Sequence, residues 1–260
     1  MNKFFTKTVA LLAIGLSTLA NAQFNNKNRI EKLQEFDFQK FSWGFYLNGS
    51  VYDYKLVLHP RYGMENDKNL VSSKASIGFG AGLIGKMRIN DHIDLRIEPG
   101  LQFVERELRF DTQSNDQYSA GSISNEPFTP LQLSESDKIR KVKSTYLDVP
   151  VLAEFHGRRW YNSRPYVAGG VNYILNLQSK SNSKDDNLQG VYRSATHNFA
   201  WTAEMGVQFY FNKFKFTPAI RGTFFLNNET VKDNSGTPPY WAKSLAKAQT
   251  RAIMLVLKFE

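Results

Sequence analysis

Cysteine is absent from the 260 residues of this chain. The sequence therefore excludes disulfide bridges, and it excludes a lipid anchor attached to a cysteine after export. Beyond the N-terminus there is no run of 18 consecutive apolar residues, so we predict no transmembrane helix. The mean hydropathy is negative, but a barrel strand that exposes only alternate residues to lipid produces such an average as well.

Residues suited to metal or phosphate chemistry are few. The four histidines form neither a His pair nor a His/carboxylate cluster with the spacing of metal ligands; they are His59, His92, His156 and His197. Gly78, Gly80 and Gly82 lie within an expected strand and do not form a phosphate-binding loop. We therefore expect neither a cofactor nor a metal ion.

The N-terminus has the pattern of a secretory signal peptide. Lys3 and Lys7 precede an apolar run over residues 9–19, and Ala20-Asn21-Ala22 supplies a small-residue cleavage site. The run is too short to anchor the chain across a bilayer. We predict a signal peptide at residues 1–22, a periplasmic arm at 23–40 with a short helix near 29–35, and a barrel at 41–260. The arm is expected to plug the barrel, to bind a partner, or to remain a loose terminus.

The stretch from Phe199 to Phe211 alternates in character. Its odd positions are apolar and rich in aromatics, and its even positions are mostly small or polar. This period of two indicates a β-strand with one apolar and one polar face. Pro99-Gly100 predicts a bulge or bend in the third strand. A short helix is expected near residues 241–248. The eight expected strands cover residues 41–52, 75–89, 93 to about 110, 142–155, 164–177, 199–211, 214–227 and 252–259.

The connections between these strands alternate in length. The first, third, fifth and seventh are long and polar, and the second, fourth and sixth are short. Short periplasmic turns and long outer loops are typical of outer-membrane barrels. A soluble lipocalin-like barrel is the alternative, but aromatics that crowd both strand ends favour lipid outside. We predict an all-β fold, an eight-stranded antiparallel up-and-down transmembrane β-barrel in the cell outer membrane, with a short periplasmic N-terminal arm.

The formal net charge is +9, and Lys3 and Lys7 of the predicted signal peptide contribute to it. Such an excess can indicate nucleic-acid binding, but an exported protein does not meet nucleic acid. The charge fits loops near anionic lipid headgroups, or a solvated surface. We expect outer-membrane lipid as a partner and no nucleic acid.

The polar face of the strands is rich in ionisable residues. An eight-stranded barrel is just wide enough for its own side chains to fill, and charges of both signs confined there should pair. The inward set is Lys86, Arg88, Asp94, Arg96, Glu98, Arg106, Asp148, Glu154, Glu204, Arg221 and Lys258. We predict a barrel-interior polar network of Arg96, Glu98, Asp148, Glu154, Glu204 and Arg221. Its predicted centre is Arg96, Glu98, Asp148 and Glu204. A proton or ion path and an open pore are the alternatives.

An enzyme is the rival class, because some small outer-membrane barrels are lipid hydrolases or acyltransferases. A hydrolase needs a serine and a histidine within hydrogen-bond reach, with an acid that orients the imidazole. The candidate set is Ser194, His197 and Asp185, near the outer rim. A solvated loop histidine is the simpler interpretation of His197. We therefore predict no enzymatic activity and no catalytic residue.

Several blocks of the sequence carry a family resemblance. They are Phe36-Asp37 before Trp43-Gly44-Phe45-Tyr46-Leu47, LRIEPGL at 95–101, YLDVPVL at 146–152, RPYVAGG at 164–170 and LVLKF at 255–259. In these blocks the chain resembles the PorT/SprT family of small outer-membrane barrels of Bacteroidota, which is linked to type IX protein secretion and, in gliding species, to motility. The resemblance implies a non-enzymatic accessory role, with contacts to other secretion components through the arm or the outer loops. A general surface barrel for adhesion or envelope integrity is the alternative.

Overall fold

The computed structural model of the chain describes residues 31–60, 62–65, 68–110, 134–184, 186–237 and 240–260. The predicted signal peptide and residues 23–30 of the predicted arm lie outside this part of the chain. Within these ranges no helix has the length and apolar character needed to cross a membrane.

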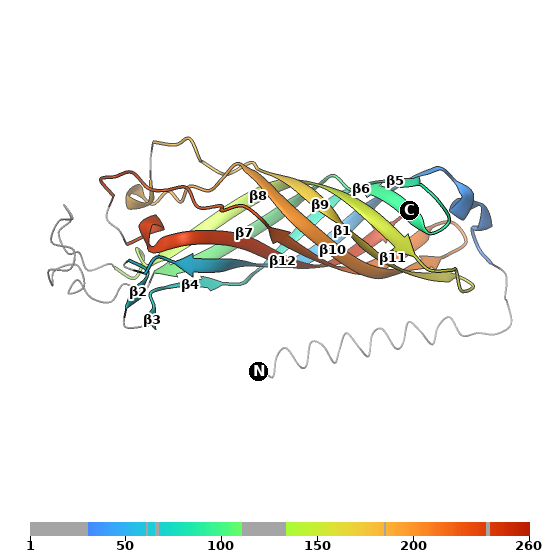
Figure 1. Cartoon of the computed structure of the whole chain (residues 1–260), viewed down its shortest axis with the longest axis horizontal. Helices are drawn as coiled ribbons and strands as arrows, with labels where there is room; N and C mark the ends of the chain where they lie inside the picture. Colours follow the sequence, from blue (N-terminus) through green and yellow to red (C-terminus); the bar gives the residue numbers. More distant parts are fainter. Residues whose placement is uncertain (1–30, 61, 66–67, 111–133, 185, 238–239) are drawn as a thin grey trace.

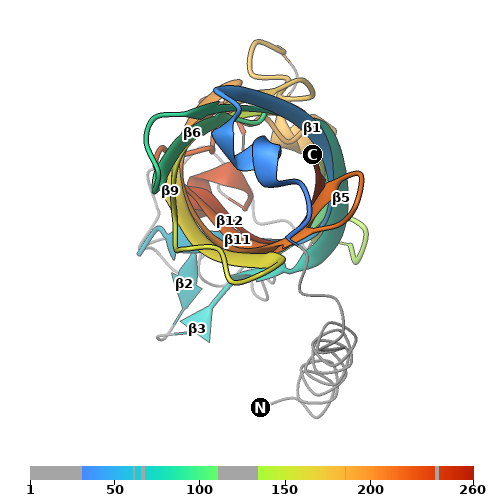
Figure 2. The same ribbon diagram turned by 90° about the vertical axis from the view of Figure 1, so that its right-hand side faces the viewer.

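A closed ring of antiparallel strands forms the body of the protein (Figures 1 and 2). β1 pairs with β12 on one side and with β5 on the other, so the sheet has no open edge within the ring. β6 and β7 are two halves of one strand, and with this pair counted once the predicted eight-stranded barrel is confirmed. The wall consists of β1 (Phe41–Leu58), β5 (Ser76–Arg88), β6 (Ile93–Ile97), β7 (Gly100–Phe110), β8 (Ile139–His156), β9 (Ser163–Asn176), β10 (His197–Tyr210), β11 (Lys215–Phe225) and β12 (Leu245–Phe259).

The break between β6 and β7 falls at Glu98 and Pro99, where the sequence predicts a bulge or bend. The Glu98 amide donates to the Pro150 carbonyl at 3.2 Å, and the Leu83 amide donates to the Pro99 carbonyl at 2.9 Å. The next residue is glycine because a Cβ at position 100 would lie 2.1 Å from the Tyr46 hydroxyl oxygen. Ile97 and Gly100 keep one register with β5 and with β8, so the interruption inserts no extra residue and is not a bulge. The break holds the Glu98 side chain in the lumen, where it is fully buried.

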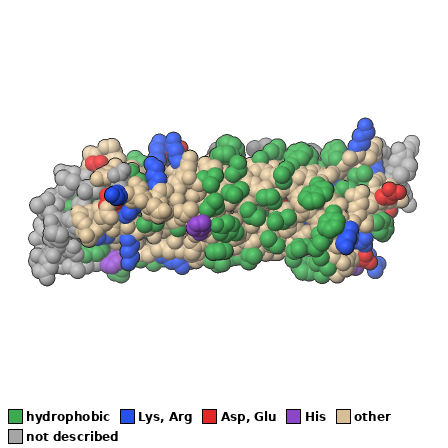
Figure 3. All heavy atoms as spheres, turned by 90° about the horizontal axis from the view of Figure 1, so that it is seen from above, with side chains coloured by type: hydrophobic (Ala, Val, Ile, Leu, Met, Phe, Trp, Pro, Cys, Tyr) green, Lys and Arg blue, Asp and Glu red, His purple; other side chains and the backbone are tan. Residues whose placement is uncertain are grey.

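The outer wall carries a broad band of apolar side chains, which Figure 3 shows in green. Alternate residues point outward, and several of them are more than half exposed, including Trp43, Ile77 and Ile253. Rings stack between neighbouring strands of this wall, as in Trp201 and Phe224, whose centroids lie 4.5 Å apart. A surface of this kind is stable in hydrocarbon and not in water. The predicted outward orientation of the apolar face is therefore confirmed.

At the end that bears the long connections, the wall extends further than the alternation predicts. β1 runs to Leu58, and β12 begins at Leu245. The short helix expected near 241–248 is wrong, since η3 (Ala242–Ser244) is a single 3-10 turn that leads directly into β12. Inward apolar residues fill this extension; they are Tyr54, Val71, Leu108, Phe110, Val142, Tyr240, Trp241, Leu245 and Ala248.

Smaller elements complete this end. β2 (Met64–Glu65) and β3 (Lys68–Asn69) form a separate hairpin, and β4 (Val71–Lys74) precedes β5 and pairs with β7. A short 3-10 turn, η2 (Asn187–Gln189), lies in the link between β9 and β10.

The chain before β1 crosses the opposite opening of the barrel. Its 3-10 helix η1 (Gln34–Phe38) lies further along the chain than the helix expected near 29–35. Figure 2 looks along the barrel from this side and shows the blue segment across the ring. The short turns 89–92, 157–162 and 211–214 lie between the strand ends here. By the rule that short turns face the periplasm, this opening is the periplasmic mouth.

Candidate functional site

Three basic and three acidic side chains meet inside the barrel. Each is at most 4% exposed, and their formal charges cancel. This charge balance stabilises the fold, because burying an unpaired charge costs free energy. We call this set the central cluster; its members are Arg96 of β6, Glu98 of the break, Glu154 of β8, Glu204 of β10, Arg221 of β11 and Lys258 of β12.

Glu204 and Glu98 each bind three cations. Glu204 Oε1 accepts hydrogen bonds of 2.6 Å from both Arg96 Nη2 and Lys258 Nζ, and its Oε2 accepts one of 2.7 Å from Arg221 Nε. Glu98 Oε1 lies 2.9 Å from Lys258 Nζ and 3.2 Å from Arg96 Nε, and its Oε2 contacts Arg221. Arg96 also contacts Glu154. The contacts join β6 with β8, β10, β11 and β12 across the lumen.

Strand alternation places these side chains inside, and register decides which of them meet. Glu204 lies directly opposite Arg221 in the β10–β11 pair, which brings opposite charges together. Tyr46 lies opposite Lys258 in the β1–β12 pair, and Tyr166 donates to Glu204 over 2.7 Å. Neutral tyrosines therefore fill the space that the charged groups leave.

Five of the six residues predicted for the polar network lie in the central cluster: Arg96, Glu98, Glu154, Glu204 and Arg221. Lys258, which was expected only to point inward, is the sixth member. Asp148 does not belong to it, and the structure contradicts its predicted place at the centre.

Asp148 has a neutral partner. It is buried and accepts a hydrogen bond of 2.9 Å from Asn172 Nδ2, and it forms no ion pair with any described residue. In the β7–β8 pair it lies opposite Gly100, two residues beyond Glu98, which corresponds to about 7 Å along a strand. It therefore lies in a layer nearer the outer end, which the sequence pattern does not distinguish from the central one.

A second polar layer surrounds Arg106 of β7. Its guanidinium donates to Ser144 at 2.8 Å and to Tyr146 at 2.5 Å, and it lies 4.2 Å from the centre of the Tyr54 ring. Glu229 lies 3.6 Å from the same guanidinium. Glu229 belongs to the long link before β12, outside every expected strand, so no alternation signal identifies it.

Little space separates these layers. A void of about 10 Å³, lined by Tyr52, Gln102, Tyr146 and Asp148 among others, has room for about one water molecule. The described side chains therefore fill the barrel between the central cluster and the outer layer.

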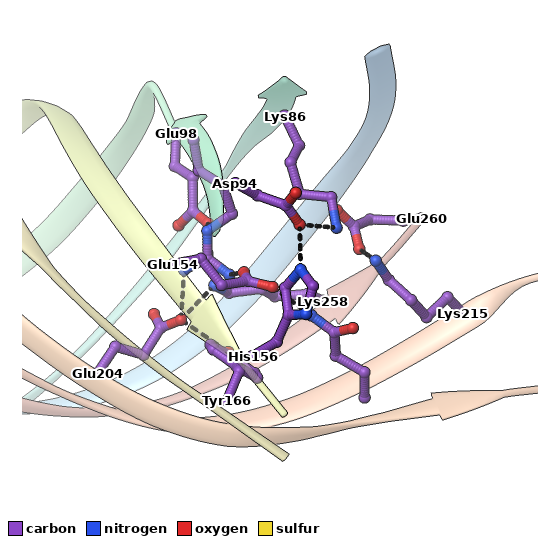
Figure 4. A network of polar contacts seen from close by, with 12 residues as sticks. Lys86, Asp94, Glu98, Glu154, His156, Tyr166, Glu204, Lys215, Lys258 and Glu260 are labelled. Atoms are coloured by element: carbon purple, nitrogen blue, oxygen red, sulfur yellow. Dashed lines mark hydrogen bonds and ion pairs between the residues drawn. The ribbon is translucent and has the colours of Figure 1, made fainter. Parts of the chain in front are cut away.

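A third layer faces the periplasmic mouth. His156 is the last residue of β8, one residue beyond the predicted end of this strand, and it is buried. Its Nε2 lies 3.3 Å from Asp94 Oδ2, and Lys86 Nζ lies 3.1 Å from the same oxygen (Figure 4). Lys215 pairs with Glu260 close by. Lys86, Asp94 and His156 border a cavity of about 480 Å³ that the arm also lines.

Asp94, Glu154 and His156 are the described residues that could together hold a metal ion, since one ligand atom of each lies within 4.8 Å of the others. Their carboxylates already have cationic or amide partners. Lys86 binds Asp94, while Arg96 and Gln208 bind Glu154. The arrangement is that of an ion-paired network, and a metal ion there would have to displace these donors.

Asp37 attaches the arm to the mouth. Its Oδ2 lies 3.1 Å from Arg159 Nη1 and 3.3 Å from Arg164 Nη2, and its Oδ1 accepts a hydrogen bond of 2.7 Å from the Tyr210 hydroxyl. The Arg159 guanidinium stacks 3.8 Å from the centre of the Tyr210 ring. Arg159 lies in the turn between β8 and β9 and faces the arm. The Phe36 ring lies 4.7 Å from Lys215 Nζ, directly beneath the third layer.

The hydrolase candidate does not assemble. His197 is exposed on the outer wall, where its Nδ1 lies 2.7 Å from the Tyr173 hydroxyl. Ser194 is buried, and its hydroxyl accepts from Asn176 at 3.0 Å and donates to the Ser179 carbonyl at 3.4 Å. Asp185 lies outside the described residues. The serine and histidine therefore have separate partners and lack the arrangement that a hydrolase needs.

Comparison with known proteins gives one family. Residues 21–231 match the model of the family described as outer membrane protein beta-barrel domain. No curated protein matches the chain.

Several solved structures are similar to this chain. Neisserial surface protein A has 11% identity and a TM-score of 0.38, covering 85% of this chain and 98% of its own. OprG of Pseudomonas aeruginosa has 12% identity and a TM-score of 0.38, covering 84% and 91%. Ail of Yersinia pestis, with a bound heparin analogue, has 10% identity and a TM-score of 0.37, covering 85% and 99%.

Proposed function

The chain belongs to the outer membrane protein beta-barrel domain family and resides in the outer membrane, and on this premise we propose that it is a non-enzymatic barrel with a filled, non-conducting lumen. The observation that carries this proposal is the central cluster, which joins five strands and leaves no excess charge. Planar-bilayer recording tests it. We expect no steady conductance, and large stable channels would overturn the filled-lumen proposal.

We further infer that the protein is a PorT-like accessory component of type IX secretion. The support is the set of sequence blocks shared with that family, from Phe36-Asp37 to the terminal strand. The mature chain would then begin at Gln23 after removal of the signal peptide, and residues 23–40 would form the periplasmic arm. Asp37 lies in the first of these blocks and attaches the arm to the barrel, which makes the arm the candidate contact for other secretion components.

A deletion strain tests the secretion role. Loss of the protein is expected to leave secretion cargo in the periplasm. A chain without residues 23–40, expressed in the deletion strain, should form the barrel but should not restore export of the cargo. Asp37→Asn, which leaves the rest of the arm in place, tests whether attachment of the arm to the barrel is needed for export. Normal export in the deletion strain would refute the secretion role.

A general surface barrel is the alternative proposal. The supporting observation is the outer extension beyond the lipid-facing band. It has its own apolar core, and the connecting segments there are joined by hydrogen bonds. Arg193, for example, donates to the carbonyls of Ser183 and Lys232 in two different links. Under this alternative the deletion strain would export normally but lose adhesion or envelope integrity. A small-barrel lipid hydrolase is the third alternative, and the separate partners of Ser194 and His197 speak against it.

A further inference from the structure

Basic side chains gather on one part of the outer wall, beyond the apolar band at the loop end. Six exposed cations and three carboxylates, Asp53, Glu105 and Glu107, point outward there. Figure 3 shows Lys and Arg side chains beyond both ends of the band. We call the six cations the basic arc; they are Lys55 of β1, Lys74 of β4, Arg109 of β7, Lys141 and Lys143 of β8, and Arg251 of β12.

The basic arc is continuous across neighbouring strands. Lys74 lies opposite Glu107, which lies opposite Lys141, so one row crosses β4, β7 and β8. Lys143 lies opposite Glu105 in the adjacent row. Arg251 lies opposite Asp53 on the far side of β4, where β12 meets β1.

The carboxylates leave the lysines largely free for another anion. Glu105 is shared by two lysines, at 3.9 Å from Lys141 Nζ and 3.6 Å from Lys143 Nζ. The lysine side chains remain 63% and 70% exposed. Exposed pairs at such distances contribute little stability, so a phosphate can replace the carboxylate as a partner.

The basic arc lies at the edge of the lipid-facing band. Ile253, which is 63% exposed, lies two residues from Arg251 on β12, on the side away from the loop end. Phe103 on β7 lies two residues from Glu105, also on the side away from the loop end. Two residues span about 7 Å along a strand, which is the depth from hydrocarbon to the headgroups. Lysine and arginine side chains can therefore reach a headgroup phosphate from this position.

The remaining wall has no such charge at this level. On β9, β10 and β11 the outward positions hold Tyr173, Leu175, His197, Phe199 and Phe224. General solubility would call for charge around the whole rim. The exposed cations are instead confined to β12, β1, β4, β7 and β8. This arrangement indicates a binding site on one side of the barrel.

We propose that the basic arc binds the phosphate groups of an anionic glycolipid in the outer leaflet, holding that lipid against β4, β7 and β8. Its acyl chains would lie on the apolar band below, beside Phe79 and Phe103, whose rings stack 5.3 Å apart. This inference rests on the outer-membrane location and not on the secretion role. A negative result for lipid binding would therefore leave the proposed secretion role standing, and a negative result for secretion would leave lipid binding standing.

The test titrates the purified full barrel in neutral detergent with bisphosphorylated lipid A and with its dephosphorylated form. The wild type should prefer the phosphorylated form. The double variant Lys141→Gln/Lys143→Gln should bind it more weakly, by about five-fold for each lysine removed at low salt. A heat-dependent gel shift establishes that each variant is folded.

The matched control is Lys180→Gln/Lys184→Gln, which removes the same charge from exposed positions in the link between β9 and β10. It should keep the wild-type affinity. Equal binding of both lipid forms by the wild type would overturn the proposal. Equal weakening in the control variant would also overturn it, because net charge alone would then explain the binding.

Discussion

Glu204 and Arg221 lie directly opposite each other on β10 and β11, and Arg221 Nε donates to Glu204 Oε2 over 2.7 Å. Both side chains are fully removed from solvent. The same carboxylate also binds Arg96 and Lys258, so this pair couples neighbouring strands to the opposite wall. Loss of this pair should therefore lower the free energy of unfolding of the barrel.

Glu204→Gln removes one charge from a cluster that is otherwise neutral. Arg96, Arg221 and Lys258 would then face two carboxylates, and one buried cation would lack compensation. We expect the free energy of unfolding to fall by about 3–5 kcal/mol. Urea unfolding in lipid vesicles, followed by tryptophan fluorescence, measures this change. A variant as stable as the wild type would show that the cluster contributes nothing.

Asp148→Asn is the matched change outside the central cluster. An asparagine there can still accept the hydrogen bond from Asn172 through its amide oxygen. We expect a loss below about 1 kcal/mol, the usual net worth of one hydrogen bond. The same unfolding assay should place Glu98→Gln near Glu204→Gln and Asp148→Asn near the wild type. The reverse order would contradict the layer assignment.

Gly100→Ala should destabilise the barrel through crowding. A Cβ at position 100 would lie 2.1 Å from the Tyr46 hydroxyl oxygen and 2.8 Å from the Ala81 carbonyl oxygen. Overpacking of this kind costs about 1–3 kcal/mol. Gly49→Ala is the control, because a Cβ at position 49 meets nothing within 4 Å. Similar unfolding midpoints for the two variants would mean that Tyr46 moves aside.

Asp37→Asn should release the arm from the mouth. The change removes the charge that Arg159 and Arg164 bind, although Tyr210 can still donate to the amide oxygen. Charge-assisted hydrogen bonds contribute about 1.5–3 kcal/mol each, so trypsin should cleave after Lys32 and Lys40 at least ten-fold faster.

Mass spectrometry of timed digests measures that cleavage. Glu35→Gln is the control, since Glu35 is exposed and forms no ion pair with the described residues. Cleavage at the wild-type rate in the Asp37 variant would show that other contacts hold the arm.

Alternation along single strands determined most of the fold. Phe199 to Phe211 reads as one apolar and one polar face because side chains of a strand point to opposite sides, which is a local property of the backbone. Pro99 marked the β6–β7 break for an equally local reason, since proline has no amide to donate. The outer extension could not be predicted in this way, because inward residues such as Tyr54 and Leu245 are apolar, so apolar and polar positions no longer alternate there.

The sequence by itself also determined that all six charges of the central cluster point into the lumen. Tertiary structure alone decided which of them meet. Arg96 and Glu204 lie 108 residues apart in the chain, and Glu98 and Lys258 lie 160 apart. Their meeting depends on the stagger of strands around the closed ring, which periodicity does not encode. That stagger places Lys258 in the central cluster and Asp148 in another layer.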